Sequence, residues 1–397
     1  MGGMSLPPVY VVSAARTPIG AYLGSLSAVK APELGSIAIK AALERAGVAP
    51  ELVGHVFMGN VLSAGQGQAP ARQALRGASI PDAVQAVTVS KVCGSGMEAI
   101  IQGARALALG DADIIVAGGM ESMSNVPYYL DKGRQGYRMG NATLIDGMIH
   151  DGLWDPYANI HMGNCGDKTA AEFKVSREAQ DEFAANSFRK AVAAQKEGHF
   201  DAEIAPVSVA QKKGEALVIK NDEGPAKGDP SKMAGLRPAF GKDGTITAAN
   251  ASSINDGASA LVLATEAAVK KHNLKPLAKL LGYGGAAQAP EWFTTAPAKA
   301  MDATLAKLSL RPDDIDLVEI NEAFAVVPMV CTTLSKLDPA KVNVRGGAVA
   351  LGHPIGASGA RIVTTLLHAM KGLDKKRGMA SICIGGGEAL VTVFEKV

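Results

Sequence analysis

The sequence predicts an α/β fold built from two copies of one layered unit. Short apolar runs alternate with helical patterns in the first third of the chain, and this alternation resumes after about residue 251. Alternation of this kind is typical of sheets that are covered by helices. Two segments of the first half also recur, in the same order, in the second half. A duplicated unit has a natural site where its two copies meet.

In the first third, apolar runs predict strands and helical periodicity predicts helices. Strands are expected at 9–13, 84–92 and 113–117. Helices are expected at 34–46 and 97–109, where small and apolar residues form a buried face. The resulting order of strands and helices indicates a layered sheet.

The section from about residue 123 to 250 differs from the flanking sequence, because its predicted loops are longer and its charged residues are denser. Within it, 176–197 has the pattern of a long helix. We expect an inserted loop or lid domain there. The predicted domains are 1–122 for the N-terminal half, 123–250 for the insertion, 251–276 for the completion of that half and 277–397 for the C-terminal half.

The duplication rests on two internal similarities. Residues 48–60 resemble 310–322, and residues 114–121 resemble 381–388. Each similarity is weak alone, but their shared order favours duplication with the middle section inserted into the first copy.

The bulk composition excludes several classes of protein. The 397 residues suggest two or three domains, at roughly 100–200 residues each. A content of 47% hydrophobic residues argues against disorder, and a net charge of +2 gives no reason to expect nucleic acid or an anionic membrane as a partner. No run of about 18 apolar residues suggests a membrane span, and neither terminus shows a targeting signal, so a cytoplasmic protein is expected.

Cys93 stands where a predicted strand ends and a predicted helix begins. Free amides at a helix N-terminus favour negative charge, which would lower the pKa of this thiol from about 8.5. Gly94 and Gly96 would let a substrate approach the backbone closely. Together these features predict an activated nucleophile.

Two other interpretations of this segment remain open at this point. Gly94, Gly96 and Ala99 after a strand also fit a dinucleotide-binding fingerprint, with Glu121 as its ribose-binding acid. Alternatively, Cys93 is simply a small buried residue, as most cysteines are.

The second half of the chain supplies possible partners for Cys93. His353 lies in a glycine-dense loop before an apolar helix, where packing explains a histidine poorly. Cys383 ends a predicted strand in a run of glycines, and Asn321 follows another strand and offers an amide. Acyl-transfer chemistry can use such a set. The other two cysteines, Cys165 and Cys331, lie outside glycine-rich strand ends and are expected to be structural, and no C-x-x-C pair suggests zinc.

The motifs around these residues resemble the signatures of the thiolase family in identity, order and spacing. They are VCGSGMEA at 92–99, NEAF at 321–324, GHPIG at 352–356 and CIGGG at 383–387, together with SAARTPIG at 13–20. The similarity covers essentially the whole chain. It implies the thiolase fold, with two duplicated α/β/α/β/α-layered halves and an inserted loop domain.

The resemblance also implies a mechanism. The cysteine matching Cys93 carries the acyl group, the histidine matching His353 takes its proton, and the cysteine matching Cys383 acts as base and acid at the α-carbon of the second substrate. One oxyanion is met by the backbone amides of Cys93 and Gly385, and the other by His353 with a water held by Asn321. No metal and no cofactor are expected, because coenzyme A thioesters are the substrates.

For the substrate, the resemblance implies a short acyl group. His161 and Met162 match the pair at the acyl end of short-chain acetoacetyl-CoA thiolases, and Ser252 matches a serine that contacts coenzyme A. Many bacterial relatives place an Arg near 224–226 against the nucleotide, whereas Lys227 stands here. Further positions match the lining of the pantetheine tunnel: Leu153, Phe240, Ala323 and Phe324.

The expected reaction is the reversible condensation of two acetyl-CoA to acetoacetyl-CoA and CoA. The alternatives are a broad-specificity 3-ketoacyl-CoA thiolase of fatty-acid breakdown and a non-catalytic acyl-CoA or lipid carrier on the same scaffold. The resemblance also implies a homotetramer built from dimers, with 123–141 as a candidate contact loop, and leaves potassium binding near 248–251 open. Glu388 has no explanation from the sequence.

Overall fold

The computed structural model describes residues 7–397 and is organised around a ten-stranded mixed sheet. The strand order is β14-β15-β16-β13-β1-β12-β5-β3-β4, with β2 paired to β12. The strands are β1 (Val9–Arg16), β2 (Gly20–Ala21), β3 (His55–Gly59), β4 (Gln85–Val89), β5 (Ile114–Ser122), β12 (Asn255–Thr265), β13 (Ala278–Ala287), β14 (Leu317–Ile320), β15 (Arg377–Ile384) and β16 (Glu388–Lys396).

The two halves of this sheet repeat the same pairing. In the first half β3 runs parallel to β5, and in the second half β14 runs parallel to β15. These strand pairs carry the segments that resemble each other in the sequence. Antiparallel pairing of β1 with β13, starting at Val9 and Leu280, joins the two halves.

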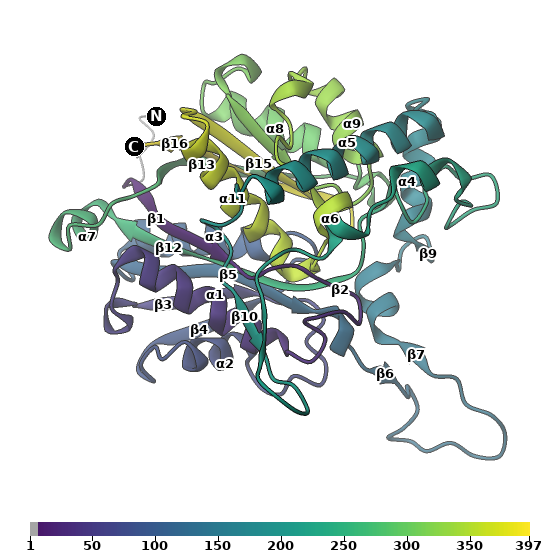
Figure 1. Cartoon of the computed structure of the whole chain (residues 1–397), viewed down its shortest axis with the longest axis horizontal. Coiled ribbons are helices and arrows are strands. Elements are labelled where there is room, and N and C mark those ends of the chain that lie inside the picture. The colour runs from purple at the N-terminus through teal and green to yellow at the C-terminus, as the bar shows by residue number, and fades with distance from the viewer. Residues whose placement is uncertain (1–6) are drawn as a thin grey trace.

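Helices form layers on both faces of the sheet (Figure 1). Helices α3 (Ser95–Leu109) and α11 (Ile355–Gly372) pack against each other between the two halves. Helices α1 (Ala31–Ala46) and α2 (Pro70–Gly77) cover the outer face of the first half, and α8 (Ala296–Lys307) with α9 (Val326–Leu334) covers that of the second.

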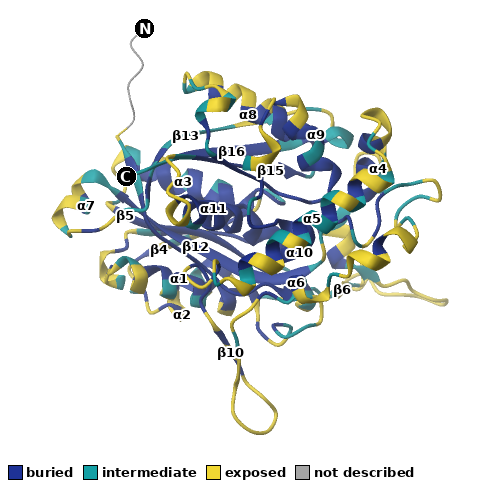
Figure 2. Ribbon diagram, turned by 45° about the horizontal axis from the view of Figure 1, so that its top comes forward, coloured by how far each residue is buried: buried dark blue, intermediate teal, exposed yellow. Residues whose placement is uncertain are grey.

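Successive side chains of β5 point to opposite faces of the sheet, and both faces are buried. Ile114 and Val116 join the core beneath α1, whereas Ile115 and Ala117 join the core around α3 and α11. Figure 2 shows α11 buried at the centre of the molecule. Of the 18 residues of α11, 15 are buried, and apart from Arg361 these are apolar, small or hydroxyl-bearing, as expected for a helix enclosed on all sides.

The middle section contributes small hairpins and helices outside the main sheet. Its strand pairs are β6 (Tyr128–Tyr129) with β7 (Ile145–Asp146), β8 (Trp154–Asp155) with β9 (Ile160–His161), and β10 (Val207–Val209) with β11 (Leu217–Ile219). Its helices are α4 (Met162–Glu172), α5 (Arg177–Lys196) and α6 (Gly224–Lys227); two further short helices, α7 (Glu266–Lys271) and α10 (Ala348–Leu351), follow later in the chain. The loop between β6 and β7 projects from the body (Figure 1).

Most predicted elements are confirmed with shifted ends. The helix expected at 176–197 is α5, which begins after Ser176 because the Ser176 side chain accepts a hydrogen bond from the Ala179 N–H. The strand expected at 113–117 runs on to Ser122, because Gly118 packs where a Cβ would overlap the Ser259 carbonyl of β12. The strand expected at 84–92 ends at Val89, since the chain turns before Cys93.

Two further features of the described chain bear on the site. Buried Arg16 at the end of β1 donates to Glu203 and Asp222, which ties the middle section to the sheet. Across residues 7–397, no helix combines the length and the apolar character needed to cross a membrane.

Candidate active site

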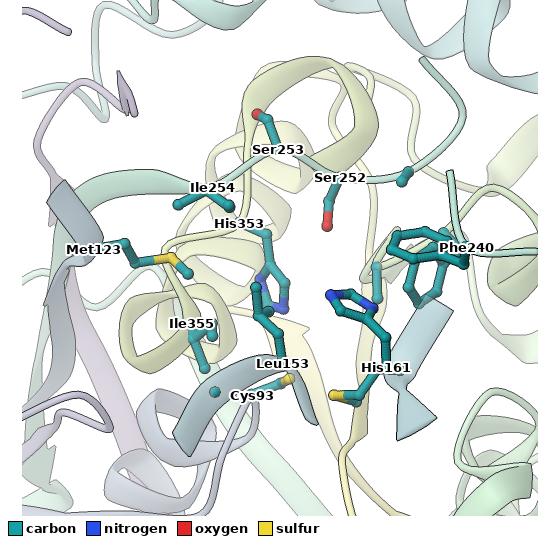
Figure 3. Close-up of a pocket in the computed structure, with 15 residues that line it drawn as sticks. Cys93, Met123, Leu153, His161, Phe240, Ser252, Ser253, Ile254, His353 and Ile355 are labelled. Carbon is teal, nitrogen blue, oxygen red and sulfur yellow. The ribbon is translucent and has the colours of Figure 1, made fainter. Parts of the chain in front are cut away.

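A cavity of about 210 Å³ opens where the two halves and the middle section meet (Figure 3). Cys93 lies at its floor, and the rings of His353 and His161 both face the space above it. The lining residues are Cys93, Met123, Gly152, Leu153, His161, Met162, Phe240, Ala251, Ser252, Ser253, Ile254, Ala323, Phe324, His353 and Ile355.

Cys93 is presented by a tight turn between β4 and α3. Val92 has a left-handed backbone, with φ of +45°, which is unusual for a β-branched residue. Ser95 stabilises this turn, because its hydroxyl donates to the Val92 carbonyl over 2.6 Å and accepts from the Lys91 N–H over 2.8 Å. The turn holds Cys93 two residues before the start of α3, next to the N-cap residue Gly94.

The predicted lowering of the Cys93 pKa is wrong. Burial of the thiol raises its pKa to about 11, although hydrogen bonds from the backbone N–H groups of Gly385 and of Cys93 itself oppose the rise. Loss of hydration therefore outweighs the helix N-terminus. Cys93 is a thiol at neutral pH and needs a base to become a nucleophile.

The two glycines after Cys93 serve packing, not the predicted approach of a substrate. A Cβ on Gly94 would overlap Ile384 at the end of β15. A Cβ on Gly96 would lie 2.8 Å from the backbone nitrogen of Ala360 in α11. The Gly356 carbonyl of α11 is approached closely by three glycines of the first half, Gly59, Gly96 and Gly119.

His353 is suited to be that base. Its Nδ1 lies 2.5 Å from the hydroxyl of Ser358, which donates its hydrogen to the Pro354 carbonyl over 2.9 Å. A hydroxyl has one hydrogen, so it accepts the Nδ1 proton, and Nε2 keeps a lone pair. Nε2 is buried and has no hydrogen-bond partner among residues 7–397. Burial and the charge of Arg361 lower the His353 pKa to about 3, so the ring is neutral.

Cys383 is fully buried at the end of β15, behind the cavity wall. Burial raises the pKa of its thiol well above the usual range, and the nearby thiols of Cys93 and Cys331 raise it further. Gly385 follows and turns its N–H to the Cys93 sulfur. The chain then bends through Gly386 and Gly387, which have φ of +90° and +92°.

Asn321 follows β14 and is 1% exposed. Its side-chain oxygen and nitrogen both lack a hydrogen-bond partner in the described part of the chain. A buried amide with neither atom satisfied indicates a site for water or ligand.

An aromatic wall closes one side of the cavity. The rings of His161 and Phe240 stack with centroids 4.4 Å apart, and Phe240 meets Phe324 edge-on at 6.2 Å. Gly163 allows this stack, because a Cβ there would overlap Phe240. The Gly163 N–H donates to Nδ1 of His161, which leaves the ring proton on Nε2 as a donor.

The other expected substrate contacts divide between two regions. Leu153, Met162, Ser252 and Ala323 line the main cavity. Leu153 ends a single π-helical turn, Ile149–Leu153, a feature that is frequent at functional sites.

Lys227 lies outside the main cavity, on an outer cavity that shares Ala251, Ser253 and Ile254 with it. Its side chain is 58% exposed and lies 3.8 Å from Glu223, a loose contact. Lys232 on the same cavity is held at 2.9 Å by Asp229. Lys227 is therefore the less neutralised of these two cations.

The dinucleotide interpretation is excluded by Glu121. Its carboxylate is fully buried and accepts hydrogen bonds from Asn60, Val61, Leu62 and Gly356, so it cannot reach a ribose. These bonds fix the loop after β3 to the first turn of α11.

The remaining residues singled out by sequence have structural surroundings. Cys165 and Cys331 are buried in a core cluster, and the Cys331 thiol donates to the Thr294 carbonyl. Glu388, unexplained by sequence, accepts from Lys91 over 2.5 Å and so links the loop before Cys93 to β16. In residues 7–397 there is no group of three or more His, Cys, Asp or Glu side chains placed to hold a metal ion.

Sequence reasoning missed Ser358 and Asn255. Ser358 stands one turn into the helix that follows His353, so a hydroxyl five residues after the histidine was the available signal. Asn255 accepts from the His353 N–H over 2.9 Å and donates to the Gly20 carbonyl over 2.9 Å. Nothing in the sequence around Asn255 points to that contact.

The arrangement supports acyl transfer to sulfur. A buried thiol, a neutral imidazole with a free lone pair and two backbone N–H groups meet at one end of an apolar cavity. A second thiol lies close by, where it can exchange a proton with a bound group.

Comparison with known proteins agrees with this geometry. Residues 9–267 match the family described as "Thiolase, N-terminal domain", and residues 274–396 match "Thiolase, C-terminal domain". The chain is similar to the acetyl-CoA acetyltransferase of Cupriavidus necator, with 51% identity over 98% of this chain and 99% of that protein. It is 48% identical to the mitochondrial acetyl-CoA acetyltransferase of Bos taurus, over 99% and 92% of the two chains.

A solved structure is also similar. The crystal structure of a thiolase from Ascaris suum in complex with coenzyme A superposes with a TM-score of 0.94 at 46% identity, covering 98% of this chain and all of that one.

Proposed function

This chain belongs to the thiolase family, and we infer that it is an acetyl-CoA C-acetyltransferase, which reversibly condenses two acetyl-CoA to acetoacetyl-CoA and CoA. The observation that carries the inference is the meeting of Cys93 and neutral His353 at one end of the cavity, with the Cys383 thiol close behind Cys93.

In the first half-reaction the Cys93 sulfur attacks the thioester carbonyl of acetyl-CoA. His353 Nε2 takes the thiol proton as the sulfur–carbon bond forms. The bond between the carbonyl carbon and the CoA sulfur breaks, and the proton leaves with CoA. Because the pKa of Cys93 is raised to about 11, proton transfer accompanies attack and does not precede it.

In the second half-reaction Cys383 acts as the thiolate, which its raised pKa makes a strong base, and removes an α-proton from a second acetyl-CoA. The carbanion attacks the acetyl group on Cys93, a carbon–carbon bond forms, and the Cys93 sulfur leaves. Cys383 returns its proton to the Cys93 sulfur, which closes the cycle. Proton transfer of this kind typically contributes about 10²–10⁴-fold to rate.

Two sets of donors stabilise the oxyanions. The backbone N–H groups of Cys93 and Gly385, which approach the Cys93 sulfur, serve the tetrahedral intermediate on that sulfur. A water on the Asn321 amide serves the enolate of the second acetyl-CoA, whereas Nε2 of His353 has no hydrogen to donate in this tautomer. Every step uses residues of the chain, so we assign no step to a metal or a cofactor, and CoA thioesters enter as substrates.

The substrate follows from the shape of the cavity. The acetyl group lies between Cys93 and Met162, with pantetheine along Leu153, Ser252 and the aromatic wall. The nucleotide reaches the outer cavity, where Lys227 meets a phosphate.

For assembly and location, we propose a cytoplasmic homotetramer. The projecting loop between β6 and β7 supports this assembly because it exposes large apolar side chains, among them Leu130, Met139 and Leu144. Strand β4, at the end of the sheet order, also presents an edge to a partner.

The test is thiolysis of acetoacetyl-CoA by the wild type and by Cys93→Ala, with 3-ketohexadecanoyl-CoA as a comparison substrate. We expect turnover of acetoacetyl-CoA, weaker turnover of the long substrate and loss of activity in Cys93→Ala. Cys165→Ala is the matched control, because that thiol does not line the cavity, and should remain active. Preference for the long substrate, or an active Cys93→Ala, overturns the inference.

A further inference from the structure

The Asn321 side chain is placed by its backbone alone. Neither of its polar atoms has a partner within residues 7–397, so no side-chain hydrogen bond fixes the amide. Its own N–H donates to the Ser381 carbonyl over 3.0 Å. The direction of the amide therefore depends on how firmly the neighbouring residues hold the main chain.

A second asparagine, Asn343, holds the main chain of the residue before Asn321 and the side chain of the residue after it. Its Oδ1 accepts from the Ile320 N–H over 2.9 Å, and its Nδ2 donates to the Ile320 carbonyl over 2.9 Å. The same Nδ2 donates to the Glu322 carboxylate over 2.8 Å. Three hydrogen bonds from one amide thus bracket Asn321.

Asn343 is itself fixed and buried. It is 2% exposed, and its N–H donates to the Val318 carbonyl over 2.9 Å, so it continues the edge of β14. Its φ of +46° is left-handed, a conformation that Asn adopts more readily than most residues. An amide side chain of this length can accept from the N–H of Ile320 and donate to the carbonyl of the same residue, which explains asparagine at this position.

We propose that Asn343 is a positioning residue that sets the Asn321 amide for the carbon–carbon bond-forming step. The proposal rests on the function inferred above, in which Asn321 holds the water that stabilises the enolate. Asn343 touches no reacting atom and acts through Asn321.

If Asn343 has this role, its loss affects the two half-reactions differently. Acetyl transfer to Cys93 uses the backbone N–H groups of Cys93 and Gly385 and does not need the Asn321 amide. Enolate formation does need it. A misplacement of about 1 Å can cost roughly 10²-fold in rate, so a loosened Asn321 slows the second step selectively.

The experiment compares wild type with Asn343→Gly, which keeps the left-handed backbone but removes the amide. The acetylation rate of Cys93 is measured by rapid quench and mass spectrometry, and the second step by acetoacetyl-CoA formation and by α-proton exchange of acetyl-CoA in D₂O. We expect condensation and exchange to fall about 10²-fold and acetylation to stay within about 3-fold. Asn273→Gly, at an exposed left-handed asparagine, is the matched control and should change neither rate.

Two further variants separate positioning from general damage. Asn321→Ala should show the same selective loss, and the double variant should be no slower than Asn321→Ala, because Asn343 acts through Asn321. Asn343→Asp keeps the side-chain volume but loses both donated bonds, so it should repeat the effect if the glycine variant is unstable.

Equal losses in both half-reactions, no loss in either, or multiplied losses in the double variant would overturn the proposal. A wild type that forms no acetyl adduct on Cys93 would instead overturn the inferred function, so the two failures are distinguishable.

Discussion

The Nδ1 atom of His353 lies 2.5 Å from the hydroxyl oxygen of Ser358, one turn into the helix that follows the histidine loop. Ser358 is fully buried and its hydrogen is committed to the Pro354 carbonyl. The contact therefore selects the tautomer of His353 in which Nε2 can accept a proton.

Replacing Ser358 by Ala should slow acetylation of Cys93 by roughly 10-fold to 100-fold, because both tautomers of His353 then become populated. The KM for acetyl-CoA should change little, since Ser358 does not line the cavity. Stopped-flow acetylation and ¹⁵N NMR of the imidazole measure the two effects. Thr364→Val removes another buried hydroxyl of α11, one that contacts Ser259, and should leave the acetylation rate and the imidazole tautomer unchanged. An equal loss of acetylation rate in Thr364→Val would contradict a specific role for Ser358.

The raised Cys93 pKa predicts a steep pH dependence of alkylation. Because the thiol titrates at about 11, the thiolate fraction and the iodoacetamide rate should rise about tenfold per pH unit between about pH 7 and pH 10. Peptide mapping after timed alkylation gives the rate at this residue. A plateau below about pH 8 would show that the helix N-terminus prevails after all.

The lowered His353 pKa predicts that the pH profile of kcat/KM has no acid limb near the usual histidine pKa. The ring stays neutral as the pH falls until about 3, so protonation of His353 should not reduce kcat/KM for acetyl-CoA between about pH 7 and pH 5. Initial rates across that range, corrected for unfolding by a parallel fluorescence melt, provide the measurement. A loss with a midpoint near about 6.5 would contradict it.

Replacing Glu121 by Gln should destabilise the fold by roughly 2–4 kcal/mol, because the amide presents donors to backbone N–H groups that the carboxylate accepted. Burial raises the pKa of Glu121 in the folded protein to about 7, above its value in the unfolded chain. The stabilising contribution of the protonated side chain is therefore complete below the pKa of the unfolded chain and is lost as the pH rises through about 7. The difference in Tm between wild type and variant should therefore be larger at about pH 5 than at about pH 8. Glu215→Gln, at an exposed loop position, is the control, and a difference independent of pH would contradict the assignment.

Removing the Lys227 charge should raise the KM for acetoacetyl-CoA about 3-fold to 10-fold with kcat unchanged, as expected for an exposed cation that meets a phosphate. Acetoacetyl-pantetheine, which lacks the nucleotide, should show no change in KM. Lys232→Ala should have the smaller effect, because Asp229 already neutralises that side chain. A reversed order would show that Lys232 is the main contact.

The sequence predicted the layered fold well, because apolar periodicity reports burial directly. It also singled out Cys93, His353 and Cys383, which stand beside glycines at a strand end or in a loop, and Asn321, which follows a strand. The structure brings these four to one region, but their roles as catalytic groups remain predictions that the variants above test.

What the sequence could not predict depends on neighbours distant in the chain. The Cys93 pKa follows from total burial by both halves, which a local helix N-terminus does not reveal. Glu121 resembled a ribose ligand because its four hydrogen-bond donors come from the loop after β3 and from α11, which the local sequence does not reveal. Helix α4 was missed because it is short and begins with the polar, glycine-containing segment after His161.

The close approach of Gly59, Gly96 and Gly119 to the Gly356 carbonyl has a consequence for recombination between related genes. The helix that carries the histidine loop is seated in the half that carries the nucleophile, with no space for a single added carbon. Recombination between related genes therefore preserves activity when both sides of this contact come from matched parents.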